Sequence, residues 1–195
     1  MYVRVVAVGL CMLAAVLGCS TKEGGGSGHR DVPATPAAAE EKINGENMTG
    51  AELCKMVPPK FVADLFKITI ASTKPDDRNQ EPVTIATCEH EAADELFPVA
   101  VSVEVSIWPG SEDARDRVEK KFTGEAVGEY EDVDGLGDAA GFGPWRDVPD
   151  FYVLEVVTEY DDAHRDIAVS VRSQEPPTLR QVRPIAERVL EALDG

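Results

Sequence analysis

Three aspartates in a glycine-rich stretch, Asp132, Asp134 and Asp138, are the residues best suited to metal chemistry. Calcium is a hard cation that takes about six to eight oxygen ligands, and carboxylates supply them. The Asp-x-Asp-Gly spacing suits such an ion, but the rest of a complete calcium-binding loop, including its closing glutamate, is absent. The sequence therefore leaves two hypotheses open, a calcium site at these aspartates or a solvated acidic loop.

The same stretch contains Gly135-x-Gly137-x-x-Ala140, a spacing that also occurs in dinucleotide-binding proteins. That motif requires a tight turn from a strand into a helix, because the helix N-terminus binds the pyrophosphate. Further glycines and Pro144 follow here, so no helix is expected. We predict a structural turn at these glycines and no cofactor.

Glu89-His90-Glu91 combines three side chains that can ligate metals. On a strand, Glu89 and Glu91 point to one face and His90 to the other, so the three are not expected to converge. No G-x-S-x-G or H-E-x-x-H motif pairs a nucleophile with a base. We therefore predict that the chain is not an enzyme, while a catalytic triad assembled from distant residues stays the alternative.

Aromatic side chains flank loops at the ends of the expected strands. They are Trp108, Phe142, Trp145 and Tyr152, together with Phe151. Where helices cover a sheet, aromatics at such places either line a cleft that binds a small apolar ligand or complete the hydrophobic core. The sequence leaves both interpretations open.

Cys19 gives the most specific signal in the chain. Residues 5–17 are apolar and follow one basic residue, but they are too short to span a membrane, which takes about 20 residues. Such a start is typical of a secretory signal peptide. It ends in Val16-Leu17-Gly18-Cys19, which resembles the bacterial lipobox. The resemblance implies cleavage after Gly18 and a diacylglyceryl group on Cys19, which anchors the protein in a membrane; a secretory peptide with an incidental cysteine is the alternative.

Two further cysteines, Cys54 and Cys88, lie outside the leader and the lipobox. In an oxidising compartment a pair of cysteines predicts a disulfide. On the chain-entropy model, closing this loop stabilises the fold by about 3 to 4 kcal/mol. Two free thiols, one of them nucleophilic, are the alternative.

The chain divides into a leader at residues 1–18, a linker at residues 19–48 and one domain at residues 49–195. The linker begins with the lipidated cysteine, is rich in glycine, serine, proline and alanine, and cannot bury enough apolar surface to fold. The remaining residues suffice for a single core. The chain has 36 acidic and 19 basic side chains, a net charge of −17. We exclude nucleic acid as a partner, because binding phosphates requires cations.

Hydrophobic patterns predict an α+β fold, an antiparallel sheet packed by helices. The clearest strand is at residues 97–108, where valines alternate with polar residues. The other expected strands are residues 68–72, 83–88, 151–160 and 166–173, with loops at residues 73–82 and 161–165. The expected helices are residues 50–66, broken at Pro58-Pro59, residues 111–122, capped by Ser111, and residues 178–193. The second is expected to carry an apolar stripe of Ala114, Val118 and Phe122, and Pro184 predicts a kink or a late start in the third.

Three features together resemble a family of actinobacterial cell-envelope lipoproteins that is catalogued as a domain of unknown function. They are the lipobox with its linker, the pair Ala51-Glu52-Leu53-Cys54 and Cys88-Glu89-His90, and residues 133–140. Many members carry tryptophan where this chain has His90. The resemblance implies an extracytoplasmic location and a Cys54–Cys88 disulfide, but no activity.

These observations favour a non-enzymatic binding module, anchored by lipid to the extracytoplasmic face of the cell membrane. Its expected partner, besides the membrane, is an envelope protein or a small apolar ligand. The alternatives are an envelope enzyme of the hydrolase type and a calcium-stabilised structural domain.

Overall fold

The structure is a computed structural model, and it describes residues 48–94, 98–110, 112–123, 129–145, 148, 150–160 and 162–194. The expected leader, Cys19 and the linker up to residue 47 lie outside the described residues. The described strands pair antiparallel in one sheet, and four helices pack against it. The predicted α+β class is therefore confirmed.

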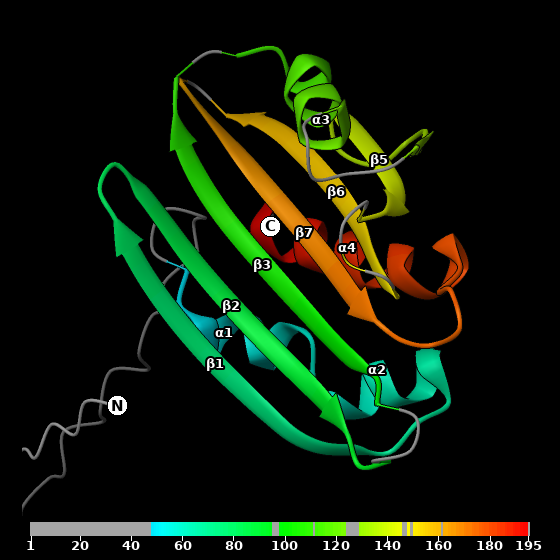
Figure 1. The fold of residues 1–195 in the computed structure, drawn as a ribbon. Coiled ribbons are helices and arrows are strands. Elements are labelled where there is room, and N and C mark those ends of the chain that lie inside the picture. Colours follow the sequence, from blue (N-terminus) through cyan, green and yellow to red (C-terminus); the bar gives the residue numbers. More distant parts are fainter. Residues whose placement is uncertain are drawn as a thin grey trace, which may run out of the picture. The chain divides into compact units, whose positions relative to one another are not determined.

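The seven described strands follow the order β1-β2-β3-β7-β6-β5-β4 across the sheet (Figure 1). Their bounds are β1 Ile70–Gln80, β2 Val83–Ala92, β3 Ala100–Pro109, β4 Glu131–Asp132, β5 Ala139–Pro144, β6 Phe151–Tyr160 and β7 Ala163–Arg172. β3 and β7 are distant in sequence but adjacent in the middle of the sheet, where Ser102 lies opposite Ser170. This pairing brings the two hairpins β1-β2 and β6-β7 into a single sheet.

β3 confirms the strand that was predicted from strict alternation. Val101, Val103 and Val105 are buried on one face, whereas Ser102 and Glu104 point to the other face and are half-buried. A strand with one buried face requires this period of two. We call the face with the three valines the inner face of the sheet and the opposite one the outer face.

Three helices cover the inner face. They are α1 Gly50–Met56, α2 Pro59–Phe66 and α4 Leu179–Asp194. Their buried side chains, among them Leu53, Val62 and Ile185, form one hydrophobic core with strand residues such as Val103 and Val169. Figure 1 shows the three helices behind the sheet. Burial of this apolar surface is the main force that holds the layers together.

The break predicted between the first two helices is confirmed. Thr49 caps α1 in a capping box, because its hydroxyl accepts from the Glu52 N–H while the Glu52 carboxylate accepts from the Thr49 N–H. Pro58 is extended and Pro59 opens α2, where a missing N–H costs no hydrogen bond. α4 continues through Pro184 as one helix.

The fourth helix, α3 Ala114–Thr123, packs on the outer face against β5 and β6. Its predicted apolar stripe of Ala114, Val118 and Phe122 is buried there. The predicted cap Ser111 lies outside the described residues. Asp113 accepts hydrogen bonds from the backbone N–H groups of Arg115 and Asp116 in the first turn. Figure 1 shows α3 in front of one end of the sheet, so the outer side of β3 and β7 is not covered by it.

The loop predicted at residues 73–82 is wrong, because β1 runs through most of it and pairs with β2 along its length. β1 is an edge strand whose side chains are mostly exposed on both faces. Polar residues such as Lys74, Asp76 and Arg78 therefore occupy it without the alternation that reveals a half-buried strand. The hairpin turn falls at Glu81 and Pro82.

Two other predicted boundaries also differ. The glycine-rich stretch, where a turn but no strand was predicted, contains the small hairpin β4-β5. The loop predicted at residues 161–165 is shorter, because Tyr160 pairs with Ala163 and β7 begins there. His164 consequently lies on a strand and is buried, instead of occupying a loop tip.

Candidate functional site

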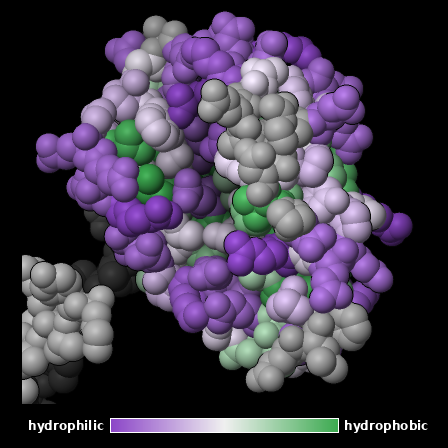
Figure 2. All heavy atoms as spheres, in the orientation of Figure 1, coloured by the Kyte–Doolittle hydropathy of each residue, from purple (hydrophilic) through white to green (hydrophobic). Residues whose placement is uncertain are grey.

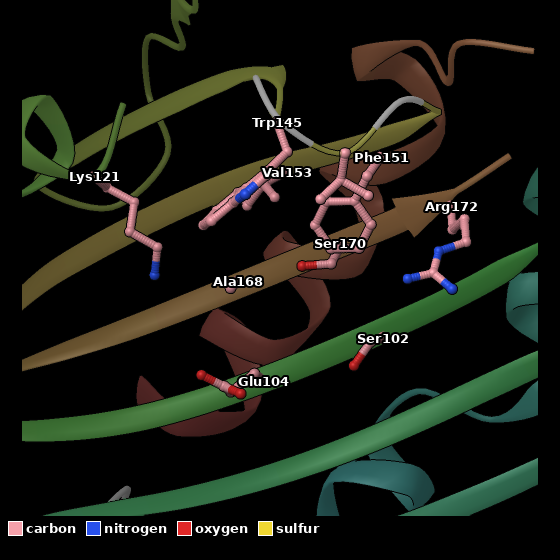
Figure 3. Close-up of a pocket in the computed structure, with 10 residues that line it drawn as sticks. Ser102, Glu104, Lys121, Trp145, Phe151, Val153, Ala168, Ser170 and Arg172 are labelled. Atoms are coloured by element: carbon pink, nitrogen blue, oxygen red, sulfur yellow. The ribbon is translucent and has the colours of Figure 1, made fainter. Parts of the chain in front are cut away.

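The outer face of the central strands carries polar side chains and contains a groove. Figure 2 views this face and shows a mostly hydrophilic surface, with apolar atoms confined to small separate patches. A groove of about 330 Å³ lies between β3, β6, β7, α3 and the segment that follows β5. Its lining residues are Ser102, Glu104, Lys121, Trp145, Val148, Phe151, Val153, Ala168, Ser170 and Arg172, which define the groove from here on (Figure 3).

Two aromatic rings form the apolar part of the groove. Trp145 and Phe151 meet edge to face, with ring centroids 6.0 Å apart and planes at 89°. Both side chains are half-buried, so part of each ring is open to the groove. Val153 and Ala168, on neighbouring strands, add apolar atoms at its base. This combination suits the body of a small apolar or aromatic ligand.

Arg172 provides a positive charge at the groove. Its guanidinium carbon lies 5.9 Å from the centroid of the Phe151 ring, a cation–π contact. Among the described residues, no carboxylate forms an ion pair with it, although the chain carries a net charge of −17. By contrast, the groove carboxylate Glu104 accepts a hydrogen bond from Arg78 at 3.1 Å.

Glu155 lies beside the groove, between the sheet and α3. Only 1% of this residue is exposed, and Oε1 lies 3.3 Å from Nζ of Lys121, which lines the groove. Oε2 has no hydrogen-bond partner among the described residues. Loss of solvation on burial raises the pKa of Glu155 to about 7, with Asp166 and Glu104 adding to the rise and Lys121 opposing it.

A second ion pair attaches α3 to the sheet next to Glu155. Arg117 donates through Nε and Nη2 to the buried carboxylate of Asp166, at 2.6 to 2.8 Å. Its guanidinium carbon also lies 4.6 Å from the centroid of the Trp108 ring. A bidentate pair of this kind fixes orientation as well as charge, so it holds the helix that forms one side of the groove.

The structure separates the four aromatics that the sequence offered as a ligand site. Trp145 lines the groove. Phe142 and Tyr152 point to the inner face instead, where they stack at 6.4 Å and pack in the core. Trp108 is on the outer face but not in the groove, and its indole N–H donates to Ser106. Of the four, Trp145 therefore lines the groove, and Phe142 and Tyr152 belong to the core.

The three aspartates proposed as calcium ligands have other partners. Asp132 pairs with Arg115 at 2.7 Å, and the Asp138 carboxylate accepts the Glu159 N–H at 2.7 Å. The carbonyl of Asp134 accepts from Arg183 at 3.1 Å. In the described part of the chain, no group of three or more acidic, histidine or cysteine side chains is placed to hold a metal ion.

The glycine spacing that matched a dinucleotide motif forms a turn between β4 and β5, as predicted. Gly137 has φ of 63°, and a Cβ built there would lie 2.7 Å from Val156 Cγ1 and 2.8 Å from the Val157 carbonyl oxygen. Glycine is required at this position both by its backbone conformation and by the close approach of β6. The motif thus has a structural explanation.

The residues around Cys88 follow the predicted alternation. Cys88 and His90 are buried on the inner side of β2, while Glu91 faces outward and pairs with Lys74. Cys54 and Cys88 form the predicted disulfide, with Cα atoms 5.2 Å apart. It joins α1 to β2 within the core. Its thiols are therefore paired, which excludes the alternative of two free cysteines.

Sequence reasoning missed Glu155, Lys121, Arg172 and the two serines of the groove. One signal was available for Glu155, which interrupts an apolar run from Val153 to Val157. An apolar run without alternation indicates a strand that is buried on both faces, so a carboxylate within it is expected to be buried as well. The others are polar residues with no distinctive sequence pattern around them. The pairing of β3 with β7 brings Ser102, Ser170 and Arg172 together, and the packing of α3 on the sheet adds Lys121.

No helix in the described part of the chain is long and apolar enough to cross a membrane. No protein-family model matches the chain, and neither a curated protein nor a solved structure matches it. The resemblance to cell-envelope lipoproteins therefore stays a prediction from the sequence.

Proposed function

We propose that this protein is a non-enzymatic binding module, anchored by lipid to the extracytoplasmic face of a membrane, which holds a small ligand with an apolar body. The observation that carries the proposal is the groove on the outer face, where Trp145 and Phe151 stand beside polar groups that have no partner within the described residues. A concave site with aromatic walls and a few polar groups is the usual form of a small-molecule site.

The anchor and the location rest on Cys19 and on the disulfide. Cys19 follows an apolar leader at the position where lipoproteins are lipidated, and the bond between Cys54 and Cys88 fits an oxidising compartment.

The groove favours binding over catalysis. No histidine lines it within the described residues, so Ser102 and Ser170 lack the imidazole base that most often activates a serine nucleophile. Glu155 has the pKa of a general acid or base, but its free oxygen is sealed from solvent and so from a substrate in the groove. We therefore propose no catalytic step.

The anchor is tested by feeding cells an alkyne-tagged palmitate and following the label on the protein. We expect label and membrane association for the natural chain, and loss of both in Cys19→Ser. Cys11→Ser is the matched control, because Cys11 lies within the leader. Unlabelled natural protein in the soluble fraction would contradict the lipid anchor.

Ligand binding is tested by native mass spectrometry of residues 20–195, exported through a secretory leader so that the disulfide forms, and exposed to an envelope extract. We expect a stoichiometric bound mass of metabolite size. A bare protein, lighter by two hydrogens for its disulfide, would contradict the proposal and would direct the search to protein partners.

A further inference from the structure

Arg172 is the cation in the groove without an anionic partner among the described residues. The other groove cation, Lys121, pairs with Glu155. The carboxylate Glu91 lies in the same cross-strand row as Arg172, but it accepts from Ser72 and Lys74, both at close to 2.8 Å. In a chain with 36 acidic and 19 basic side chains, a guanidinium that has no ion pair with a described carboxylate can bind an anion that enters the groove.

Two hydroxyl groups stand next to that guanidinium. Ser102 and Ser170 are directly opposite each other on β3 and β7, on the outer face. Ser170 and Arg172 are two residues apart on one strand, so their side chains share that face. Neither serine hydroxyl makes a hydrogen bond with another described residue. Figure 3 shows Arg172, Ser170 and Ser102 at the same end of the groove as Phe151.

We infer that the groove binds a monocarboxylate with an apolar body, its carboxylate held by Arg172, Ser102 and Ser170 and its body lying against Trp145 and Phe151. The inference rests on the proposed binding function and names the ligand class. A planar guanidinium and a planar carboxylate form two parallel hydrogen bonds, and each serine has one O–H to donate.

The carboxylates near the groove favour a ligand with one negative charge over a ligand with two. Glu89 lies opposite Ser102 on β2, and Glu104 lines the groove. Both carboxylates face the outer side of the sheet, where they oppose a dianion such as a phosphate monoester more strongly than a carboxylate. One guanidinium compensates a single charge, so the carboxylate is the better match.

The matched probes are 4-phenylbutyrate and its neutral amide, titrated calorimetrically into residues 20–195. We expect the acid to bind about tenfold more tightly than the amide, because only the acid forms charge-assisted bonds to Arg172. Phenyl phosphate should bind more weakly than the acid. Added salt should weaken binding of the acid and leave the amide unchanged.

Arg172→Gln should remove the preference for the acid over the amide, so that the two bind with similar affinity. Ser170→Ala should reduce this preference. Arg180→Gln, at an exposed position of α4, is the control with the same charge change and should keep the preference. Melting temperatures of the variants establish that each is folded.

Equal binding of acid and amide to the natural protein, abolished by Trp145→Ala, would overturn the carboxylate inference but leave the groove as a binding site. Absence of binding by both probes would also overturn it. A stoichiometric mass captured from envelope extract by the same protein would then show that the binding function survives without this ligand class.

Discussion

Nζ of Lys121, on α3, lies 3.3 Å from Oε1 of Glu155, on β6, at the edge of the groove. Lys121 is 38% exposed in its side chain and Glu155 only 2%, so the pair joins a solvated cation to a buried carboxylate. The attraction is therefore screened on one side, whereas the desolvation of Glu155 is nearly complete. This imbalance explains why the pKa of Glu155 rises despite its partner.

Glu155→Gln should make the protein more stable above neutral pH. Below about pH 4.5 the carboxyl is protonated in both folded and unfolded states. Between pH 4.5 and about pH 7, Glu155 is ionised in the unfolded chain but still protonated in the folded one, so the folded state loses stability as pH rises. Above about pH 7 the carboxyl is ionised in both states, and the loss of stability stays constant. The shift corresponds to a cost on the order of 3 kcal/mol. Urea unfolding from pH 5 to pH 8 measures it.

The matched control is Glu119→Gln, which makes the same change at an exposed position of α3. The difference in unfolding free energy between Glu155→Gln and the natural protein should grow from pH 5 to pH 8, and that of the control should stay nearly constant. A gain at pH 8 no larger than at pH 5 would show that Glu155 is not held at a raised pKa.

Removing the disulfide with Cys54→Ala and Cys88→Ala together should cost about 3 to 4 kcal/mol, because the bond closes a loop with a sequence separation of 34. For a domain of this size the melting temperature should fall by roughly 10 °C. Cys54→Ala alone and Cys88→Ala alone should each lose nearly as much stability as the double variant, because either substitution breaks the disulfide. A much smaller loss would mean that the unfolded chain is not constrained by this bond.

Gly137→Ala should destabilise the fold by about 1 to 3 kcal/mol, because the new Cβ meets the Val157 carbonyl oxygen and the backbone is left-handed. Gly135→Ala shares the left-handed conformation, with φ of 67°, but only the Arg183 side chain lies within 4 Å, at 3.8 Å. Thermal melts of the two variants separate the clash from the backbone strain. Equal losses would show that β6 does not approach Gly137 this closely.

The parts of the fold that the sequence predicted are those with one buried face. β3 and α4 bury a regular stripe, so their periods of two and of 3.6 are visible in the positions of their apolar residues. β1 has no such stripe, because it is an exposed edge strand, and its polar residues were mistaken for a loop. The glycine-rich hairpin β4-β5 was missed for a similar reason, since glycine carries no periodic signal.

The candidate site was less predictable, because β6 is apolar on both faces. Leu154 and Val156 point inward while Val153 and Val157 point outward, and all four are buried. The apolar pattern therefore cannot show that Phe151 belongs to the outer face and Tyr152 to the core. The carboxylate-binding end depends on the pairing of β3 with β7, which no local pattern contains.

The groove itself is tested most directly by comparing Trp145→Ala with Trp108→Ala. Both variants remove a tryptophan from the outer face, but Trp145 lines the groove and Trp108 does not. In native mass spectrometry with envelope extract, we expect the bound mass to fall at least about tenfold in occupancy for Trp145→Ala. It should persist for Trp108→Ala. A bound mass retained by Trp145→Ala, or lost equally from both variants, would contradict the groove as the binding site.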